Sequence, residues 1–381
     1  MNLKGRDYIE TQDFTVEELE YLLKLSAKLK DDFRKGRPTQ LLPNQTAFLL
    51  FFDKSTRTRN AFEAGATQLG AHAHFLDSSA TQISHGETAE DTGIILGSMG
   101  HGIAIRHDLI PGAGNSYMRQ VAAATDVPVI NMQCDIDHPT QTLADLLTIR
   151  ETFGKNLRGR KIAVSWAYAP SYAKPLSVPQ GLITLMTRFG LDVTLAMPPE
   201  FKLMDKCMED ARRNAAAAGT KFEVVDNMDD AFENADIVYP KSWGAFDLMC
   251  ERLDLKTQDQ LRKNEEECLK LNAKYKDWIC DERRMKLAKK KAIYMHCLPA
   301  DRGNEVTDAV IDGPQSVVFP EAENRLHTAK AIMAATMRER PFEKYDPRPK
   351  KKTAKAAKKA AKAVKAKAAK SAKKAKSAKK K

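Results

Sequence analysis

One short segment alternates hydroxyl and guanidinium side chains: Ser55, Thr56, Arg57, Thr58 and Arg59. It follows an apolar run at residues 47–52, which predicts a buried strand, and a helix is expected from about residue 56 to residue 69. The first turn of a helix offers unpaired N–H groups and a partial positive charge, and both attract anions. Guanidinium forks match the geometry of phosphate oxygens. The segment therefore predicts a phosphate site, and the simpler alternative is a capped helix with surface arginines.

Two further segments carry groups that can polarise a carbonyl. His138 and Gln141 stand at the start of a helix expected at residues 139–153, beside Pro139, which suits a first helical turn. Cys297 lies in a His-Cys-Leu-Pro turn that follows another expected strand. Open α/β sheets place their sites in such loops at the carboxyl ends of strands. An isolated histidine or buried cysteine is often structural, so these segments gain meaning only in combination.

Strand-like and helix-like segments alternate along the body of the chain. Strands are expected at residues 47–52, 103–105, 127–131, 161–166, 192–196, 222–225, 237–239 and 292–295. Helices are expected at residues 15–30, 56–69, 139–153, 181–189, 201–218 and 326–338. Such alternation predicts the α/β class with parallel sheets and crossover helices.

The pattern restarts near residue 155, which predicts two doubly wound parallel-sheet domains with helices on both faces. We expect a first domain at residues 1–153 and a second at 154–325. A helix at residues 326–345 is expected to return to the first domain. A charged, helix-prone insertion at residues 247–291 is either a solvated helical pair or a lid over the cleft.

The formal net charge of +12 belongs to the end of this 381-residue chain. Residues 350–381 hold 16 Lys, 12 Ala and no acidic residue, so residues 1–349 carry a formal charge of −4. We expect residues 346–381 to be a disordered tail that cannot build a core. It is either a solvated appendage or a polyanion-binding tail, since blocks of like charge are often interaction tails.

The chain shows no sign of export or of a membrane span. No apolar run reaches the ~18 residues that a membrane helix needs, and the N-terminal residues lack the apolar core of a secretory signal. The six cysteines form no C-x-x-C pair, which fits a reducing compartment. A cytoplasmic location without membrane contact is expected.

Taken together, these motifs resemble the aspartate/ornithine carbamoyltransferase family along almost the whole body of the chain. The resemblance is carried by KSTRTR, SATQISHGETAEDT, DHPTQTLADLLTIRE, HCLPADRGNEVTD and ENRLHTAKAIM. The cysteine of HCLP is typical of the ornithine side of the family. The resemblance implies an enzyme that binds carbamoyl phosphate, needs no cofactor or metal, and forms a homotrimer whose active sites are shared between subunits.

The resemblance also implies a set of site residues. Those expected to bind carbamoyl phosphate are Ser55, Thr56, Arg57, Thr58, Gln82, Arg106, His138, Gln141, Cys297, Leu298 and Arg325. Gln82 would come from the neighbouring subunit. Arg57, Arg106, His138 and Cys297 would act in catalysis, with Cys297 on the acceptor side and forming no covalent intermediate.

The chain departs from ornithine enzymes where they grip the amino-acid head of their acceptor. It has neither their Asn-rich stretch nor their Asp and Ser-Met-Gly segment. Its proline-rich loop at residues 166–179 is similar to that of acetylornithine and succinylornithine carbamoyltransferases, whose chains are knotted there, so a trefoil knot is expected. Candidate acceptor contacts are Trp166, Lys174, Pro179, Lys241, Trp243 and Arg302.

Two functions follow from these patterns. The first is transfer of a carbamoyl group to an amine of an ornithine-like or other small amino-acid or amide acceptor. The alternative is a non-catalytic scaffold on the same fold that binds a polyanion through its basic tail. The complete set of site residues argues against the scaffold, which would not require them.

Overall fold

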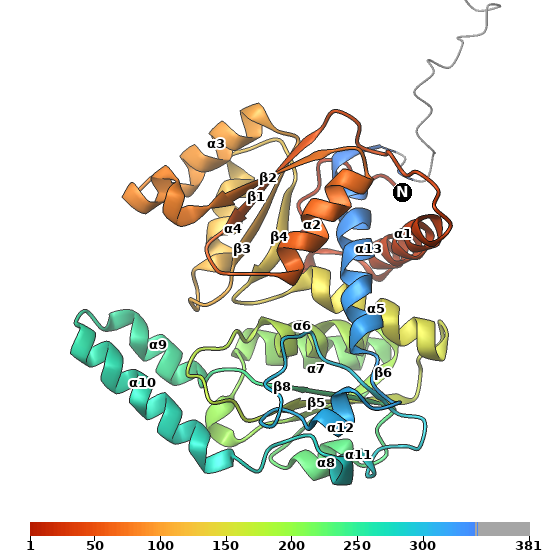
Figure 1. The fold of residues 1–381 in the computed structure, drawn as a ribbon, viewed down its shortest axis with the longest axis vertical. Helices are drawn as coiled ribbons and strands as arrows, with labels where there is room; N and C mark the ends of the chain where they lie inside the picture. The colour runs from red at the N-terminus through yellow and green to blue at the C-terminus, as the bar shows by residue number, and fades with distance from the viewer. Residues whose placement is uncertain (340, 342–381) are drawn as a thin grey trace, which may run out of the picture. The chain divides into compact units, whose positions relative to one another are not determined.

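The computed structural model describes residues 1–339 and 341, and the expected tail lies outside them. Two sheets of parallel strands form the framework (Figure 1). The predicted class, α/β with two parallel-sheet domains, is therefore confirmed. Both sheets lie within one compact unit of the chain.

The first sheet has the strand order β2-β1-β3-β4. Its strands are β1 (Thr46–Phe51), β2 (His72–Asp77), β3 (Gly102–His107) and β4 (Val129–Cys134). Neighbouring residues of a strand face opposite sides of the sheet, and the packing follows this rule. Leu49 belongs to the larger apolar cluster of the protein, whereas Leu50 belongs to a separate cluster on the other face.

Helices cover both faces of the first sheet. The helices are α1 (Val16–Arg34), α2 (Arg57–Gln68), α3 (Ala89–Met99), α4 (Gly114–Ala123), α5 (Pro139–Phe153) and α13 (Val318–Met337). Helices α3 and α4 pack together on one face, while α13 packs against α1, α2 and α5 on the other (Figure 1). The last described helix thus returns to the first sheet, as the sequence predicts.

The second sheet has the order β7-β6-β5-β8-β9. Its strands are β5 (Arg160–Trp166), β6 (Leu191–Ala196), β7 (Phe222–Val225), β8 (Ile237–Lys241) and β9 (Ile293–Tyr294). Helices α6 (Ser177–Met186) and α7 (Asp205–Ala218) lie on one face, and α8 (Met228–Phe232), α11 (Glu282–Met285) and α12 (Asp308–Ile311) lie on the other (Figure 1).

The structure corrects two expectations about elements. Strand β2 and helices α3 and α4 are absent from the sequence prediction, because their short apolar stretches show no clear period. Helix α13 begins at Val318 rather than at residue 326, so the expected domain boundary falls inside a helix. Pro320 is compatible with this earlier start, because it lies in the first turn, where the missing N–H costs no intrahelical bond.

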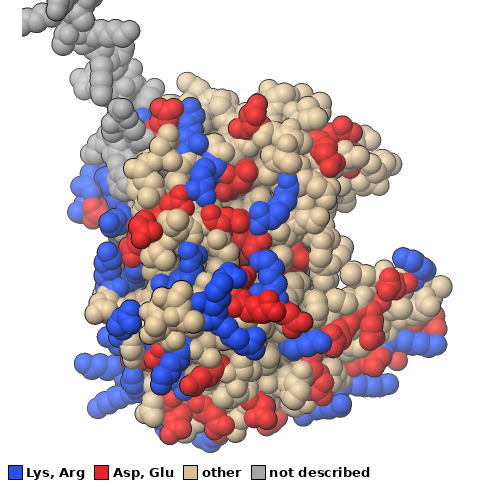
Figure 2. Space-filling view, turned by 180° about the vertical axis from the view of Figure 1, so that it is seen from behind, with Lys and Arg blue, Asp and Glu red and all other residues tan. Residues whose placement is uncertain are grey.

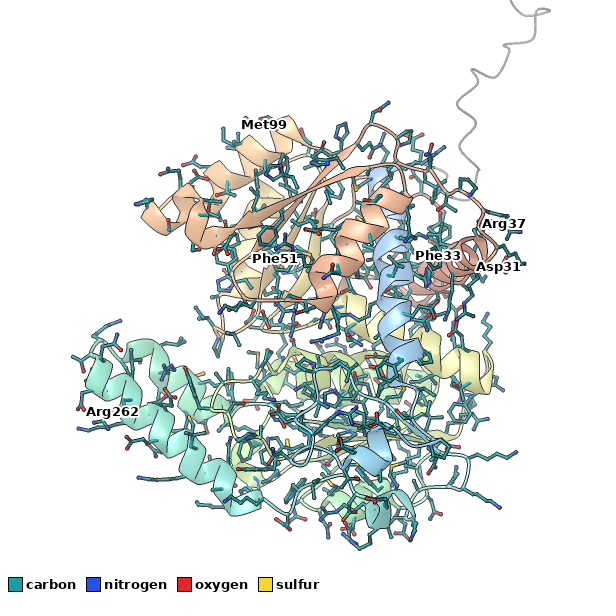
Figure 3. The ribbon with its side chains drawn as sticks, viewed as in Figure 1. Asp31, Phe33, Arg37, Phe51, Met99 and Arg262 are labelled. Atoms are coloured by element: carbon teal, nitrogen blue, oxygen red, sulfur yellow. The ribbon has the colours of Figure 1, made fainter. Side chains whose placement is uncertain are left out.

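The charged insertion forms two neighbouring helices, α9 (Phe246–Asp254) and α10 (Gln258–Asn272). They extend from the second sheet, and Arg262 lies on their outer side (Figures 1 and 3). The predicted helical character is confirmed, and the role of a lid stays a prediction.

Charges of both signs intermingle on the face of the protein shown in Figure 2. This fits the small net charge of residues 1–349. Within the described residues, no helix combines the length and the apolar character needed to cross a membrane.

Candidate active site

A cavity of about 350 Å³ gathers side chains from both sheets. Its lining residues are Lys54, Ser55, Thr56, Arg57, Thr58, Arg106, Gln133, His138, Gln141, Lys174, Pro175, Val178, Lys241, Cys297, Leu298, Pro299 and Arg325. Ten of the eleven residues expected to bind carbamoyl phosphate are among them, and so are Lys174 and Lys241. The lining holds six cationic side chains and no carboxylate, so the cavity favours an anionic ligand.

The N-terminus of α2 forms one end of the cavity. Thr56 precedes the helix and makes no side-chain cap, so first-turn N–H groups stay available. Thr58 is buried, whereas Arg57 is half-buried. Arg59 is directed elsewhere: it pairs with Glu63 and stacks on the ring of Phe75. Of the two arginines in this segment, only Arg57 lines the cavity.

Three arginines from distant parts of the chain face the same space. Arg325 donates to the hydroxyl of Thr58, and Arg106 donates to Asp108 at 2.9 Å. The Nε atoms of Arg57 and Arg106 are buried without a protein partner. Burial and the guanidinium groups of Arg106 and Arg57 lower the pKa of Arg325 to about 10. A cluster of buried cations with spare donors is suited to a multivalent oxyanion.

His138 is neutral, and its contacts define its tautomer. Arg325 has only donors, so the 3.3 Å contact from its Nη2 makes His138 Nε2 an acceptor. The proton then lies on Nδ1, which faces the hydroxyl of Thr140 at 3.3 Å. Burial and the three arginines hold the pKa of His138 well below its usual value. In this arrangement His138 does not present a donor to the cavity.

Gln141 is fully buried, and its amide contacts two acidic side chains that do not line the cavity. Its Nε2 donates to Asp145 at 2.7 Å and to Glu321 at 3.2 Å, while its Oε1 has no protein partner. Tyr239 also donates to Glu321, at 3.1 Å. Burial raises the pKa of both carboxyl groups, and the neighbouring Asp145 raises that of Glu321 further.

The turn at Cys297 is held by its own backbone. Leu298 has a φ of 54°, a left-handed conformation that is rare for a branched residue. Its N–H donates to Nδ1 of His296 at 2.8 Å, which stabilises this conformation. Burial raises the pKa of the Cys297 thiol to about 11. Cys297 therefore faces the cavity as a neutral thiol.

Two lysines also line the cavity. Lys174 pairs with Asp301 at 2.7 Å, and Lys241 lies 3.6 Å from Glu305. Glu305 is fully buried and accepts the N–H of Ser242 at 2.7 Å. Burial would raise the pKa of Glu305, but the charge of Lys241 and the hydrogen bond from His296 hold it well below its usual value.

Four candidate acceptor contacts do not line the cavity. Trp166 and Trp243 are core residues: Trp166 donates to the carbonyl of Trp243 at 2.9 Å and packs on Phe201. Pro179 is buried within α6. Arg302 is fixed at the surface by two aspartates on or beside α12. The sequence placed these residues near the site because their loops reach it, but their side chains point elsewhere.

Gln82 is exposed in a short 3₁₀ turn at residues 82–85 and does not line the cavity of its own chain. Lys54, Gln133, Pro175, Val178 and Pro299 line the cavity but were not predicted. Four of them adjoin a predicted residue in the chain, so their signal was proximity to a motif. Gln133 lies five residues before His138 and had no such signal. Asp145 carried a clearer signal, since it lies four residues after Gln141 on the same face of α5.

Known proteins match the chain over nearly its whole described length. Residues 6–151 match the family model of the aspartate/ornithine carbamoyltransferase carbamoyl-P binding domain, and residues 176–336 match that of the Asp/Orn binding domain. The putative carbamoyltransferase YgeW of Escherichia coli is 42% identical over 366 residues, covering 90% of this chain and 91% of that protein.

Two other relatives are more distant. The ornithine carbamoyltransferase of Halalkalibacterium halodurans is 34% identical and covers 88% of this chain and 97% of its own length. The crystal structure of acetylornithine transcarbamylase complexed with acetylcitrulline superposes with a TM-score of 0.76 at 34% identity, covering 87% of this chain and 98% of that one. The resemblance seen in the motifs is therefore confirmed: the chain belongs to the aspartate/ornithine carbamoyltransferase family, on its ornithine side, and is a carbamoyltransferase.

Proposed function

We propose that the enzyme moves the carbamoyl group of carbamoyl phosphate to the amine of a small acceptor that carries a carboxylate. The observation that carries this proposal is the lining of the cavity, which combines three arginines and a free helix N-terminus with Lys174 and Lys241 and holds no carboxylate. We assign the arginines and the helix N-terminus to a phosphate end and the two lysines to an acceptor end. An anion is expected at each end, with the reacting carbon between them.

The phosphate occupies the N-terminus of α2, with Arg57 and Arg325 on its oxygens. Its arrival draws Arg325 away from His138, so that the imidazole proton can move to Nε2. His138, Arg106 and Thr58 then donate to the carbamoyl oxygen. Preorganised donors of this kind can each lower the barrier by ~3 kcal/mol. The Thr140 hydroxyl can donate or accept, so it supports either tautomer of His138.

Gln141 and the backbone carbonyl of Leu298 orient the carbamoyl NH2. The acceptor amine attacks the carbamoyl carbon as a C–N bond forms, and the bond from that carbon to the phosphate oxygen breaks. The amine proton leaves with the phosphate, which is the strongest base released. Cys297, as a neutral thiol beside the acceptor, positions the amine and forms no covalent bond.

The acceptor end favours a carboxylate and disfavours a free ammonium group. Lys174 and Lys241 line it, and no carboxylate does. A panel of amines and amides, with and without a carboxylate, tests this by phosphate release from carbamoyl phosphate. Turnover confined to anionic acceptors supports the proposal. Absence of any turnover together with absence of carbamoyl phosphate binding overturns it.

We extend the proposal to a homotrimer in which Gln82 enters a neighbouring active site. Gln82 is exposed, and so are Ile94, Ile95 and Met99 on α3, the next α-helix along the chain. Figure 3 labels Met99. Exposed apolar groups of this size are typical of an interface between subunits. Light scattering gives the oligomeric state. Mixing inactive Gln82→Ala and Arg57→Met subunits restores activity only if the sites are shared.

Two smaller proposals come from the same family relationship. A knot in the second sheet is proposed from the proline-rich loop, and an experimental structure traced through residues 166–245 tests it. A cytoplasmic location is proposed from the six cysteines, which all lie free of disulfide bonds. Fractionation of cells that express the tagged chain tests it.

A further inference from the structure

Two buried carboxyl groups fix the amide of Gln141. Asp145 Oδ1 lies 2.7 Å and Glu321 Oε1 lies 3.2 Å from the same amide nitrogen of Gln141. A carboxyl oxygen accepts a hydrogen bond from the NH2 group of an amide. In the reversed orientation, the amide oxygen of Gln141 would face the oxygens of both acids and be repelled. The side chain can therefore hold only one orientation. Its Oε1 remains buried and unpartnered in a residue that lines the cavity.

The two acids share a proton. Asp145 and Glu321 are hydrogen-bonded to one another, which requires that one of them be protonated. Both oxygens of Glu321 already face donors: Oε2 accepts from the N–H of His296 at 2.9 Å, and Oε1 accepts from Tyr239. Asp145 Oδ2 has only the longer Tyr239 contact of 3.5 Å. Glu321 therefore faces more donors than Asp145, and one proton is shared between the two acids.

We propose that Asp145 and Glu321 are positioning residues that lock the amide oxygen of Gln141 toward the cavity, and that this lock selects acyl phosphates whose carbonyl carries an N–H group. Each acid belongs to a different element, since Asp145 lies on α5 and Glu321 on α13. Glu321 also holds the backbone of His296, next to the Cys297 turn. One acid pair thereby joins three of the segments that build the site.

The selectivity follows from the cost of an unpaired buried acceptor. Carbamoyl phosphate brings an NH2 group to the Gln141 oxygen, whereas acetyl phosphate brings a methyl group of similar size. With acetyl phosphate bound, that oxygen stays unpaired and cut off from water, which is unfavourable. This inference rests on the proposed use of the cavity for carbamoyl phosphate. It goes beyond that use, because it names the contact that distinguishes a carbamoyl group from an acetyl group.

Binding of carbamoyl phosphate and of acetyl phosphate to the full-length chain, measured by calorimetry without acceptor, tests the lock. We expect the wild type to bind carbamoyl phosphate at least tenfold more tightly than acetyl phosphate. Both carboxyl oxygens of Glu321 accept hydrogen bonds, and Glu321→Gln replaces one of them with an NH2 group, which can only donate. The amide of Gln141 therefore loses its fixed orientation. The preference should then fall to within about threefold, mainly through weaker binding of carbamoyl phosphate.

Asp145→Asn serves as a second variant. Its new amide keeps an oxygen for Gln141 and gives Glu321 an NH2 group in place of the shared proton, so this variant should retain more of the preference than Glu321→Gln. Asp236→Asn is the matched control, because Asp236 is a buried acid bound to Arg160 and Lys289 and does not line the cavity. It should leave the preference unchanged.

The outcomes separate this inference from the proposed function. If the wild type binds both acyl phosphates equally, or if folded Glu321→Gln keeps the full preference, the lock is refuted while the carbamoyl phosphate site stands. If the wild type binds neither compound, the proposed function itself fails.

Discussion

The guanidinium of Arg325 donates to the hydroxyl of Thr58, although 267 positions separate the two residues in the chain. The contact joins the helix that follows the first strand to the last described helix. Both residues are buried. The anion end of the cavity therefore depends on the return of α13 to the first sheet.

Arg325→Lys should weaken carbamoyl phosphate binding. Lysine keeps the positive charge but loses the planar fork that can reach Thr58 and a phosphate oxygen together. A loss of about 2 kcal/mol, or roughly thirtyfold in Kd, is expected for a charged hydrogen bond. Calorimetry checks this. Arg302→Lys is the control, since Arg302 is bound to surface aspartates and should leave Kd unchanged.

The imidazole of His138 should stay neutral from pH 6 to pH 8, because burial and the three arginines lower its pKa below the ordinary value of 6.5. Its ¹⁵N NMR signals should not titrate over this range. In the free enzyme the proton should lie on Nδ1, and carbamoyl phosphate should move it to Nε2. A signal that titrates near pH 6.5 would contradict the assignment.

The lowered pKa of His138 also predicts how the free energy of unfolding changes with pH. The unfolded chain binds a proton on this histidine below about pH 6.5 and the folded chain does not, so its contribution to the free energy of unfolding falls as the solution becomes more acidic. His138→Gln should therefore flatten the loss of stability between pH 6.5 and pH 5. Urea unfolding at several pH values measures the difference between the two proteins.

Cys297 should react slowly with iodoacetamide at pH 8, because burial raises the pKa of its thiol to about 11 and the thiolate is the reactive form. The rate should rise steeply toward pH 11. Mass spectrometry of the labelled peptide measures it. Trapping of a carbamoyl-Cys297 adduct during turnover would contradict the proposed role of this residue.

Trp166→Phe should reduce stability and leave the site intact. The change removes the hydrogen bond from the indole to the carbonyl of Trp243 and opens space beside Phe201, at a cost of about 1–3 kcal/mol in the free energy of unfolding. Urea unfolding measures this cost. A tenfold weaker acceptor interaction without loss of stability would instead indicate that Trp166 contacts the acceptor, as expected from the sequence.

Removal of residues 350–381 should leave carbamoyl phosphate binding and turnover unchanged. The family models match residues 6–151 and 176–336, and the residues that line the cavity all precede residue 326. Calorimetry and phosphate release with the truncated chain check this. Loss of activity on truncation would favour the alternative in which the basic tail carries the function.

The sequence predicted those features that depend on local order. Strand β1 and the N-terminus of α2 followed from an apolar run and the interleaved arginines, and α5 has the predicted bounds. The predictions failed where the direction of a side chain determines whether a residue lines the cavity. Trp166 ends strand β5 and Lys174 lies in the loop that follows it, yet only Lys174 lines the cavity. Spacing along a loop does not fix the direction of a side chain, whereas spacing along a helix does.

The acids behind Gln141 show the same limit. Asp145 was visible from its four-residue spacing to Gln141, but Glu321 lies 180 positions away from it. Only the packing of α13 on α5 brings Glu321 to the same amide. Acidic side chains are mostly exposed, so the sequence gives no sign that Glu321 is buried.

The place of α13 also has a consequence for the order in which the protein is made. A ribosome completes α1, α2 and α5 early, yet these helices pack on a helix whose last residue is Met337. The first sheet of the nascent chain therefore lacks part of one helical layer until the whole second sheet has been synthesised. A translation product that stops before Val318 therefore lacks both Glu321 and Arg325, and it should not hold carbamoyl phosphate in the pocket that these two residues complete.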